Sequence, residues 1–120
     1  MAFDRFAKAG ATAVLDDGGG TTIFVVRQRA AELAMKYRMA MLGPPATADS
    51  GVLLSYGYDA PTLFRRAAVL VDRILKGANP ATIPVEQVNV YELVVNLRTA
   101  RALGIELPRT LMLRATRVIE

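Results

Sequence analysis

Residues 51–77 read GVLLSYGYDAPTLFRRAAVLVDRILKG, and their pattern decides the fold class. The apolar run in the first five positions predicts a short strand. The stretch Ala60–Lys76 predicts an amphipathic helix, because its apolar side chains recur at helical spacing while charged residues fill the other positions. We expect Asp59 to cap the start of this helix, Pro61 to fit its first turn and Gly77 to end it. A strand followed by a helix is therefore the basic unit.

The rest of the chain repeats this alternation. Two further strands are predicted at Ala11–Leu15 and Met39–Leu42, one extended segment at Val85–Leu97, and helices at residues 3–9, Thr22–Tyr37, Thr99–Leu103 and Pro108–Ile119. Strands that alternate with amphipathic helices imply βαβ units and a mainly parallel sheet. The sequence thus predicts an α/β fold in a single domain over residues 1–120, and such folds bind ligands at the carboxyl ends of their strands.

Length and composition favour a folded domain with some apolar surface left over. The chain has 120 residues, of which 52% are hydrophobic and 22% are charged. A mean hydropathy of +0.28 is high for a soluble monomer of 13.0 kDa, which suggests that apolar surface meets a partner. The sequence contains no apolar run of 18 or more residues, so we expect no membrane-spanning segment.

Residue types narrow the chemistry further. The chain has no cysteine and no histidine, which excludes His-dependent catalytic triads and His/Cys zinc sites. The net charge is +4, but the arginines are spread over separate segments and do not interleave with aromatic residues, so no nucleic-acid surface is predicted. We expect a protein that is not an enzyme and needs no metal or cofactor.

The first candidate site is the segment Leu15–Thr22, which reads LDDGGGTT and lies between a predicted strand and a predicted helix. Glycines let a ligand approach the backbone, and a helix amino end favours anions. A mobile turn with a threonine cap explains the same residues equally well. The spacing matches neither common phosphate-binding motif. A receiver-like signalling domain is a remote alternative, because no lysine is placed to supply the counter-charge of phosphoryl chemistry.

The second candidate site is Ser55–Asp59, again between a strand and a helix. Tyr56 and Tyr58 flank Gly57, and this arrangement gives an apolar wall with hydroxyl groups, suited to a small ligand or a hinge. From the residues alone, a helix cap at Asp59 and two packed tyrosines are favoured over a binding site.

Two long segments carry a family resemblance. They are LLSYGYDAPTLFRRAAVLVDRILKGANPATIPVEQ, which begins at Leu53, and YELVVNLRTARALGIELPRTLMLRATRVIE, which begins at Tyr91. They resemble the carboxyl-terminal third of bacterial ABC-transporter substrate-binding proteins of the tryptophan and tyrosine type. Residues 1–50 are similar to that family less strongly.

The resemblance implies one α/β lobe of a two-lobed periplasmic binding protein, incomplete relative to the family. In that family the helix similar to residues 60–76 packs on the other lobe. The resemblance places ligand contacts at Asp16, Asp17, Gly18, Tyr56, Gly57, Tyr58 and Asp59. The DDGGG sequence departs from the bulkier loop that is usual at the first of these sites. The family is periplasmic, whereas a complete product without a signal peptide would be cytoplasmic.

The helical stripe predicts self-association, because its apolar side chains would otherwise face water. Its members are Leu63, Phe64, Ala67, Leu70, Val71 and Ile74. The leading hypothesis is a solute-binding component, or a truncated remnant of one, that serves an ABC importer and contacts its permease, with an amino acid or similar small solute as ligand. The alternative is an oligomeric interaction module that binds no solute.

Overall fold

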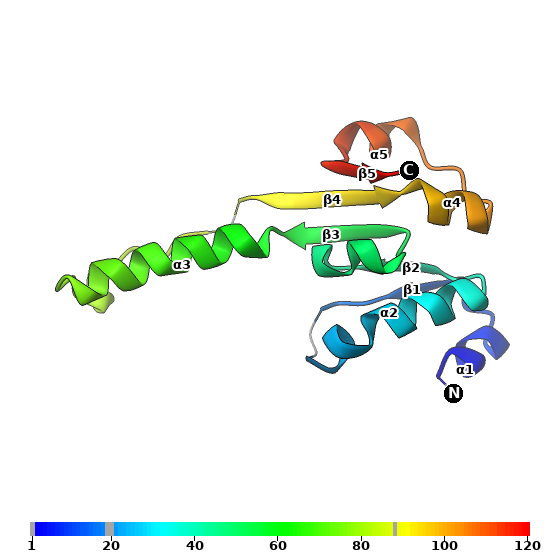
Figure 1. Ribbon diagram of the computed structural model, residues 1–120, viewed down its shortest axis with the longest axis horizontal. Helices are drawn as coiled ribbons and strands as arrows, with labels where there is room; N and C mark the ends of the chain where they lie inside the picture. Colours follow the sequence, from blue (N-terminus) through cyan, green and yellow to red (C-terminus); the bar gives the residue numbers. More distant parts are fainter. Residues whose placement is uncertain (1, 19–20, 88) are drawn as a thin grey trace. The chain divides into compact units, whose positions relative to one another are not determined.

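Five strands form one sheet in the order β1-β2-β3-β4-β5 (Figure 1). The computed structural model describes residues 2–18, 21–87 and 89–120. The strands are β1 Ala13–Leu15, β2 Ala40–Gly43, β3 Leu54–Tyr58, β4 Tyr91–Asn96 and β5 Arg117–Ile119. The helices are α1 Ala2–Lys8, α2 Thr21–Lys36, α3 Ala60–Leu75, α4 Leu97–Leu103 and α5 Arg109–Arg114, with short 3-10 helices η1 Pro45–Ser50 and η2 Pro80–Thr82.

The sheet is mainly parallel, as predicted. β1 pairs with β2, β2 with β3, and β4 with β5, all in parallel. β3 and β4 run in opposite directions in Figure 1, and the backbone bond from Asn96 N–H to the Leu53 carbonyl, 2.9 Å long, joins this pair. The predicted α/β class is therefore confirmed.

The chain divides into two compact units. Unit 1 comprises Met1–Gly57 and Glu92–Glu120, and unit 2 comprises Tyr58–Tyr91. Unit 1 thus contains most of the sheet, whereas unit 2 contains α3 and η2. The single domain that the sequence predicts over residues 1–120 stays a prediction.

The core of unit 1 lies between α2 and the sheet, next to β2. It consists of Ala31, Ala34, Met39, Met41 and Val52, all at most 4% exposed. Alanines three residues apart share one face of α2, and their small side chains let the helix approach the sheet closely. The ring of Phe3 in α1 stacks on Tyr37 with a centroid distance of 6.4 Å, which ties the first helix to the end of α2.

A second anchor joins α4 to the turn before β3. Asn96 caps α4 through its side-chain oxygen, which accepts a hydrogen bond from Thr99 N–H at 3.1 Å. The Thr99 hydroxyl donates in turn to the Gly51 carbonyl at 2.9 Å. All of these groups are buried or partly buried, so the bonds form where water cannot compete for them.

Three predicted segments differ from the observed elements by three residues or more at an end. The third strand begins at Leu54 rather than at Gly51, because Gly51 has a φ of 93° and ends η1. The extended segment predicted over Val85–Leu97 forms a strand only as β4, and residue 88 lies outside the described residues. The helix predicted to reach Ile119 ends at Arg114, because Thr116 N–H bonds the Leu93 carbonyl at 2.8 Å and the chain continues as β5.

The predicted limits of α3 are close to the observed ones. Asp59 holds the N-cap position, although its side chain bonds no backbone N–H there. At the other end Gly77 has a φ of 100°, its N–H bonds the Ile74 carbonyl, and Ala78 N–H bonds the Arg73 carbonyl. This pair of bonds is a Schellman motif, in which glycine avoids the strain of a left-handed backbone.

The core assignment predicts how unit 1 responds to truncation. Met39 is 1% exposed, so we expect Met39→Ala to lower the free energy of unfolding by about 2–5 kcal/mol through lost burial and a residual cavity. Val25→Ala is the control, because Val25 is 85% exposed and its loss should change stability by less than about 0.5 kcal/mol. Urea denaturation followed by circular dichroism measures both. Similar effects of the two substitutions would contradict the assigned core.

Candidate functional site

Asp16, Gly43 and Ser55 lie in one row across three neighbouring parallel strands, at the carboxyl ends of β1 and β2 and near the start of β3. Gly43 and Ser55 are register partners in the β2–β3 pair. Asp16 directly follows β1, and its N–H continues the ladder by bonding the Leu42 carbonyl at 2.8 Å. Register partners in a parallel sheet project to the same face, so the side chains of Asp16 and Ser55 share a face with Gly43 between them.

Both side chains in this row are buried and incompletely bonded. Asp16 is 6% exposed and Ser55 is 1% exposed. Neither Asp16 Oδ2 nor Ser55 Oγ has a hydrogen-bond partner among the described residues. Buried polar atoms are nearly always bonded in folded proteins, because leaving one unpaired costs about 1–3 kcal/mol. Asp16 and Ser55 are therefore two buried polar side chains, each with one oxygen that still lacks a hydrogen-bond partner among the described residues.

Asp16 and Ser55 are too far apart to bond each other. One strand separates them, and a strand spacing of about 4.8 Å puts their backbones roughly 10 Å apart. Gly43 supplies no side chain in the interval. An added Cβ at Gly43 would lie 2.5 Å from Thr47 Oγ1, so the Thr47 hydroxyl occupies the space above this glycine.

The predicted loop at Asp16, Asp17 and Gly18 forms a tight turn. Gly18 N–H donates to Asp16 Oδ1 at 2.9 Å, and Gly18 has a φ of 73°, which favours glycine. This bond fixes one carboxylate oxygen of Asp16 and leaves the other for a further donor. Asp17 is exposed. Gly19 and Gly20 of the predicted glycine loop lie outside the described residues, as do the side chains of Thr21 and Thr22.

A pair of prolines connects this loop with part of the second predicted site. A Cβ at Gly18 would lie 3.5 Å from Pro44 Cγ, and one at Gly57 would lie 2.8 Å from Pro45 Cδ. The backbones at Gly18 and Gly57 therefore approach the same short proline segment. The structure thus brings Gly18 and Gly57 to one short proline segment.

The aromatic and acidic members of the second predicted site are not buried. Tyr56 is 63% exposed and Tyr58 is 54% exposed. Tyr58 and Asp59 belong to unit 2, whereas Tyr56 and Gly57 belong to unit 1. Within unit 2 the carboxylate of Asp59 accepts a hydrogen bond from the Thr62 hydroxyl, so it is engaged at the start of α3.

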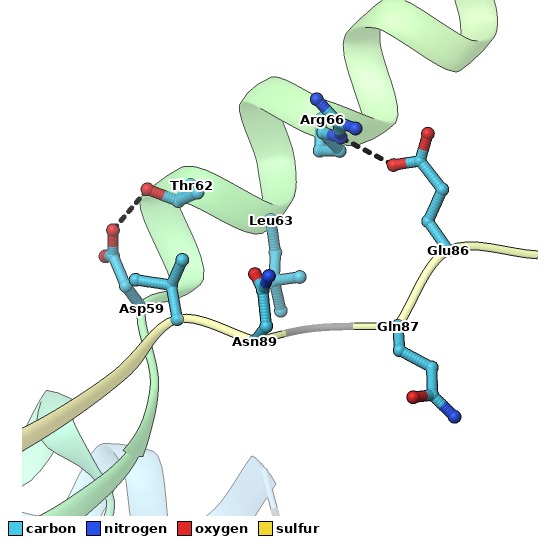
Figure 2. A pocket seen from close by; sticks show the side chains of 8 residues that line it. Asp59, Thr62, Leu63, Arg66, Glu86, Gln87 and Asn89 are labelled. Atoms are coloured by element: carbon cyan, nitrogen blue, oxygen red, sulfur yellow. Dashed lines mark hydrogen bonds and ion pairs between the residues drawn. The ribbon is translucent and has the colours of Figure 1, made fainter.

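Unit 2 contains an open crevice of about 590 Å³ between α3 and the segment that leads to β4 (Figure 2). Figure 2 shows Asp59 and Thr62 at one end and the Arg66–Glu86 ion pair at the other, with Leu63 facing Asn89 between them. Each charged group that lines the crevice has a polar partner, in contrast to Asp16 Oδ2.

The sequence did not single out four residues that complete the buried row and its rim. Gly43, Pro44 and Pro45 follow the predicted strand Met39–Leu42, where a glycine and two prolines indicate only its end, and Thr47 carries no signal. Ser55 lay inside the second candidate segment without a role of its own. Aligning the ends of the three predicted parallel strands would have placed Ser55 and Gly43 beside Asp16. In the described part of the chain, no three acidic side chains gather as a metal site would require.

The comparisons with known proteins agree on one group. The profile of a family described as ABC transporter substrate binding protein matches residues 31–119. A conserved domain protein from Vibrio cholerae O1 biovar eltor has a TM-score of 0.87 at 23% identity, with 98% of this chain and 39% of that chain covered. No curated protein matches the sequence.

Two further solved structures share the fold. An ABC domain from Streptococcus pneumonia, solved in complex with L-Trp, has a TM-score of 0.81 at 22% identity and covers 98% of this chain and 43% of its own. A ligand-free, open substrate-binding protein with adhesive properties from Clostridium difficile has a TM-score of 0.64 at 16% identity, with 98% and 39% covered. The chain thus spans about two fifths of the length of the structures it matches.

The fit between Gly43 and Thr47 can be tested directly. Gly43→Ala places a methyl group against the Thr47 hydroxyl, which itself donates to the Pro44 carbonyl at 2.7 Å, so we expect a loss of about 1–3 kcal/mol in stability. In a Thr47→Ala background the same change should cost at least about 1 kcal/mol less, because the clashing oxygen is gone. A double-mutant cycle by urea denaturation measures this coupling. Strictly additive effects would show that the two residues do not touch.

Proposed function

Because the chain belongs to the ABC transporter substrate-binding protein family, we propose that it contributes one side of a solute site in an importer and binds a small organic solute without transforming it. Substrate-binding proteins of this kind are typically non-catalytic. The whole binding protein acts by closing two lobes around its ligand, and the permease of the importer recognises the closed form. This chain corresponds to about two fifths of such a protein, so the remaining contacts come from outside it.

One observation carries the proposal: the free oxygen of the buried Asp16 carboxylate. It lies at the carboxyl edge of a parallel sheet, which is where open α/β folds bind their ligands. A buried carboxylate oxygen that lacks a donor is best satisfied by a cationic N–H group, since charge-assisted bonds are the strongest hydrogen bonds. This requirement favours a solute with an ammonium group, and an amino acid meets it. The L-Trp bound to the structurally similar ABC domain belongs to this class.

The residues at positions 16–18 and 56–59 take different parts in this proposal. Asp16 supplies the charge, and Gly18 and Gly57 pack closely against Pro44 and Pro45, which holds the backbone at this edge of the sheet in place. Asp17 and Tyr56 are proposed as outer contacts, and Tyr56 is exposed enough to meet an apolar portion of the solute. Ligand contact by Tyr58 and Asp59, which belong to unit 2, stays a prediction.

A second function has an observation of its own. The apolar face of α3 is exposed, which fits an oligomeric interaction module that binds no solute. The two functions separate in one experiment, because a solute raises the melting temperature only if a site exists, whereas oligomerisation alone leaves a panel of solutes without effect.

We expect one or more amino acids to stabilise the purified chain in a thermal unfolding panel that also contains small carboxylates without an amino group. A solute at 100 times its dissociation constant adds about 2.7 kcal/mol, or on the order of 10 °C for a domain of this size. Asp16→Asn keeps an oxygen that can accept a hydrogen bond from Gly18 N–H but removes the charge. It should therefore raise the dissociation constant of the stabilising amino acid at least about thirtyfold.

Asp4→Asn is the matched control, because Asp4 lies in α1 and its carboxylate pairs with Lys8 at 3.0 Å on the surface. It should leave the thermal shift unchanged. A panel without any shift on a well-folded protein would reject solute binding by this chain. Equal losses in the two variants would reject the role of Asp16 while leaving solute binding intact.

A further inference from the structure

Ser55 is the second incompletely bonded residue of the buried row, and the role proposed for Asp16 does not involve it. Ser55 is 1% exposed, and its Oγ has no hydrogen-bond partner among the described residues. A buried hydroxyl without a partner destabilises the folded chain, whereas an alanine at the same position would not. The hydroxyl is therefore explained better by a ligand than by a contribution to stability.

Asp16 Oδ2 and Ser55 Oγ need opposite things from a partner. The ionised carboxylate of Asp16 only accepts hydrogen bonds, whereas the serine hydroxyl has a proton to donate. A single molecule that satisfies both atoms must therefore offer a donor at one end and an acceptor at the other. The ammonium and carboxylate groups of an α-amino acid form such a pair.

The spacing of the row matches this pair of groups. Gly43 lies between Asp16 and Ser55, so their backbones are two strand spacings, or roughly 10 Å, apart. Standard bond lengths put the ammonium nitrogen of an amino acid roughly 3 Å from its carboxylate oxygens. A hydrogen bond of about 2.8 Å at each end brings the span to roughly 9 Å. One zwitterion can therefore reach from the Asp16 carboxylate to the Ser55 hydroxyl.

Thr47 occupies the space between these two groups, but its own hydrogen bonds do not tie it to the strands. Its hydroxyl lies above Gly43. Both the N–H and the hydroxyl of Thr47 donate to the Pro44 carbonyl, at 2.9 and 2.7 Å, so these bonds stay within one turn. The turn ends at Gly51, whose φ of 93° costs a glycine little. An entering solute can therefore displace the Thr47 hydroxyl without breaking either bond.

We propose that Ser55 is a specificity residue of the solute site, and that its hydroxyl donates to the carboxylate of the amino acid whose ammonium group pairs with Asp16. This inference rests on the proposed function and adds to it the requirement for a free α-carboxylate. Ser55 thus distinguishes an amino acid from the amine that lacks the carboxylate, whereas Asp16 binds the ammonium group that both share.

Pairs of amino acids and their decarboxylated amines separate the two roles. The probes are L-tryptophan with tryptamine, L-tyrosine with tyramine and L-leucine with isoamylamine, each titrated against the whole chain by isothermal calorimetry. We expect the amino acid that binds to do so at least about tenfold more tightly than its amine, because the amine lacks the acceptor for Ser55. In Ser55→Ala this ratio should fall about tenfold, with the affinity for the amine unchanged. Asp16→Asn should weaken both members of the pair.

The stability of the solute-free chain supplies a second readout. Ser55→Ala removes a buried hydroxyl that lacks a partner, so it should raise the melting temperature by about 3–6 °C. Ser50→Ala is the matched control, because Ser50 is the other serine of the chain and is not buried. It should leave the ratio unchanged and shift the melting temperature by less than about 2 °C.

The outcomes distinguish this inference from the proposed function. An unchanged ratio in Ser55→Ala would overturn the role of Ser55 while leaving solute binding at Asp16 intact. A lower melting temperature of Ser55→Ala would also overturn it, because the hydroxyl would then serve the fold. A chain that binds none of the six probes would reject the proposed function, and the role of Ser55 with it.

Discussion

The parallel pairing of β1, β2 and β3 is the constraint on which the rest of the structure depends. The register of these strands brings three segments distant in sequence together, so Asp16, Gly43 and Ser55 lie in a single row. The pairing also fixes which face each side chain occupies, because a slip of one residue would turn Asp16 and Ser55 to the other side. The polar row is therefore a consequence of the register that buries the core.

The short connection between β2 and β3 adds a local constraint to this register. η1 places Thr47 over Gly43, and its two leading prolines stand against Gly18 and Gly57. Proline has a fixed φ and glycine has no side chain, so a stiff segment meets backbones that can approach it closely. The edge of the sheet is thereby built from rigid and closely packed groups, which suits a binding site that must hold its shape before a ligand arrives.

Periodicity in the sequence was sufficient to predict the helices and the fold class, but not the strand ends. α3 repeats its apolar residues over four turns and carries its own capping signals, so its limits were predicted to within one residue. β3 and β5 depend on partners far away in the chain. The hydrogen bonds of Thr116 with Leu93 and the pairing of β5 with β4 show that the last residues join the sheet rather than extend α5. The same limit applies to the site. Asp16 could be predicted from its place in a loop after a strand, whereas the position of Ser55 beside it depends on the strand register.

The two units differ in what stabilises them, and this difference bears on function. Unit 1 has a buried core, whereas no described residue of unit 2 is buried. α3 relies instead on its local signals: the Schellman end at Gly77 and the pair of Asp72 with Lys76, whose N–O distance is 2.9 Å. Local terms of this kind contribute only a few tenths to about 1 kcal/mol each, and an isolated helix of 16 residues is marginal in water. Burial of the apolar face of α3, which carries Leu63, Phe64 and Leu70, is then the main source of stability available to this helix. The order of α3 is therefore coupled to whatever covers it, while the polar row of unit 1 is held by the sheet itself.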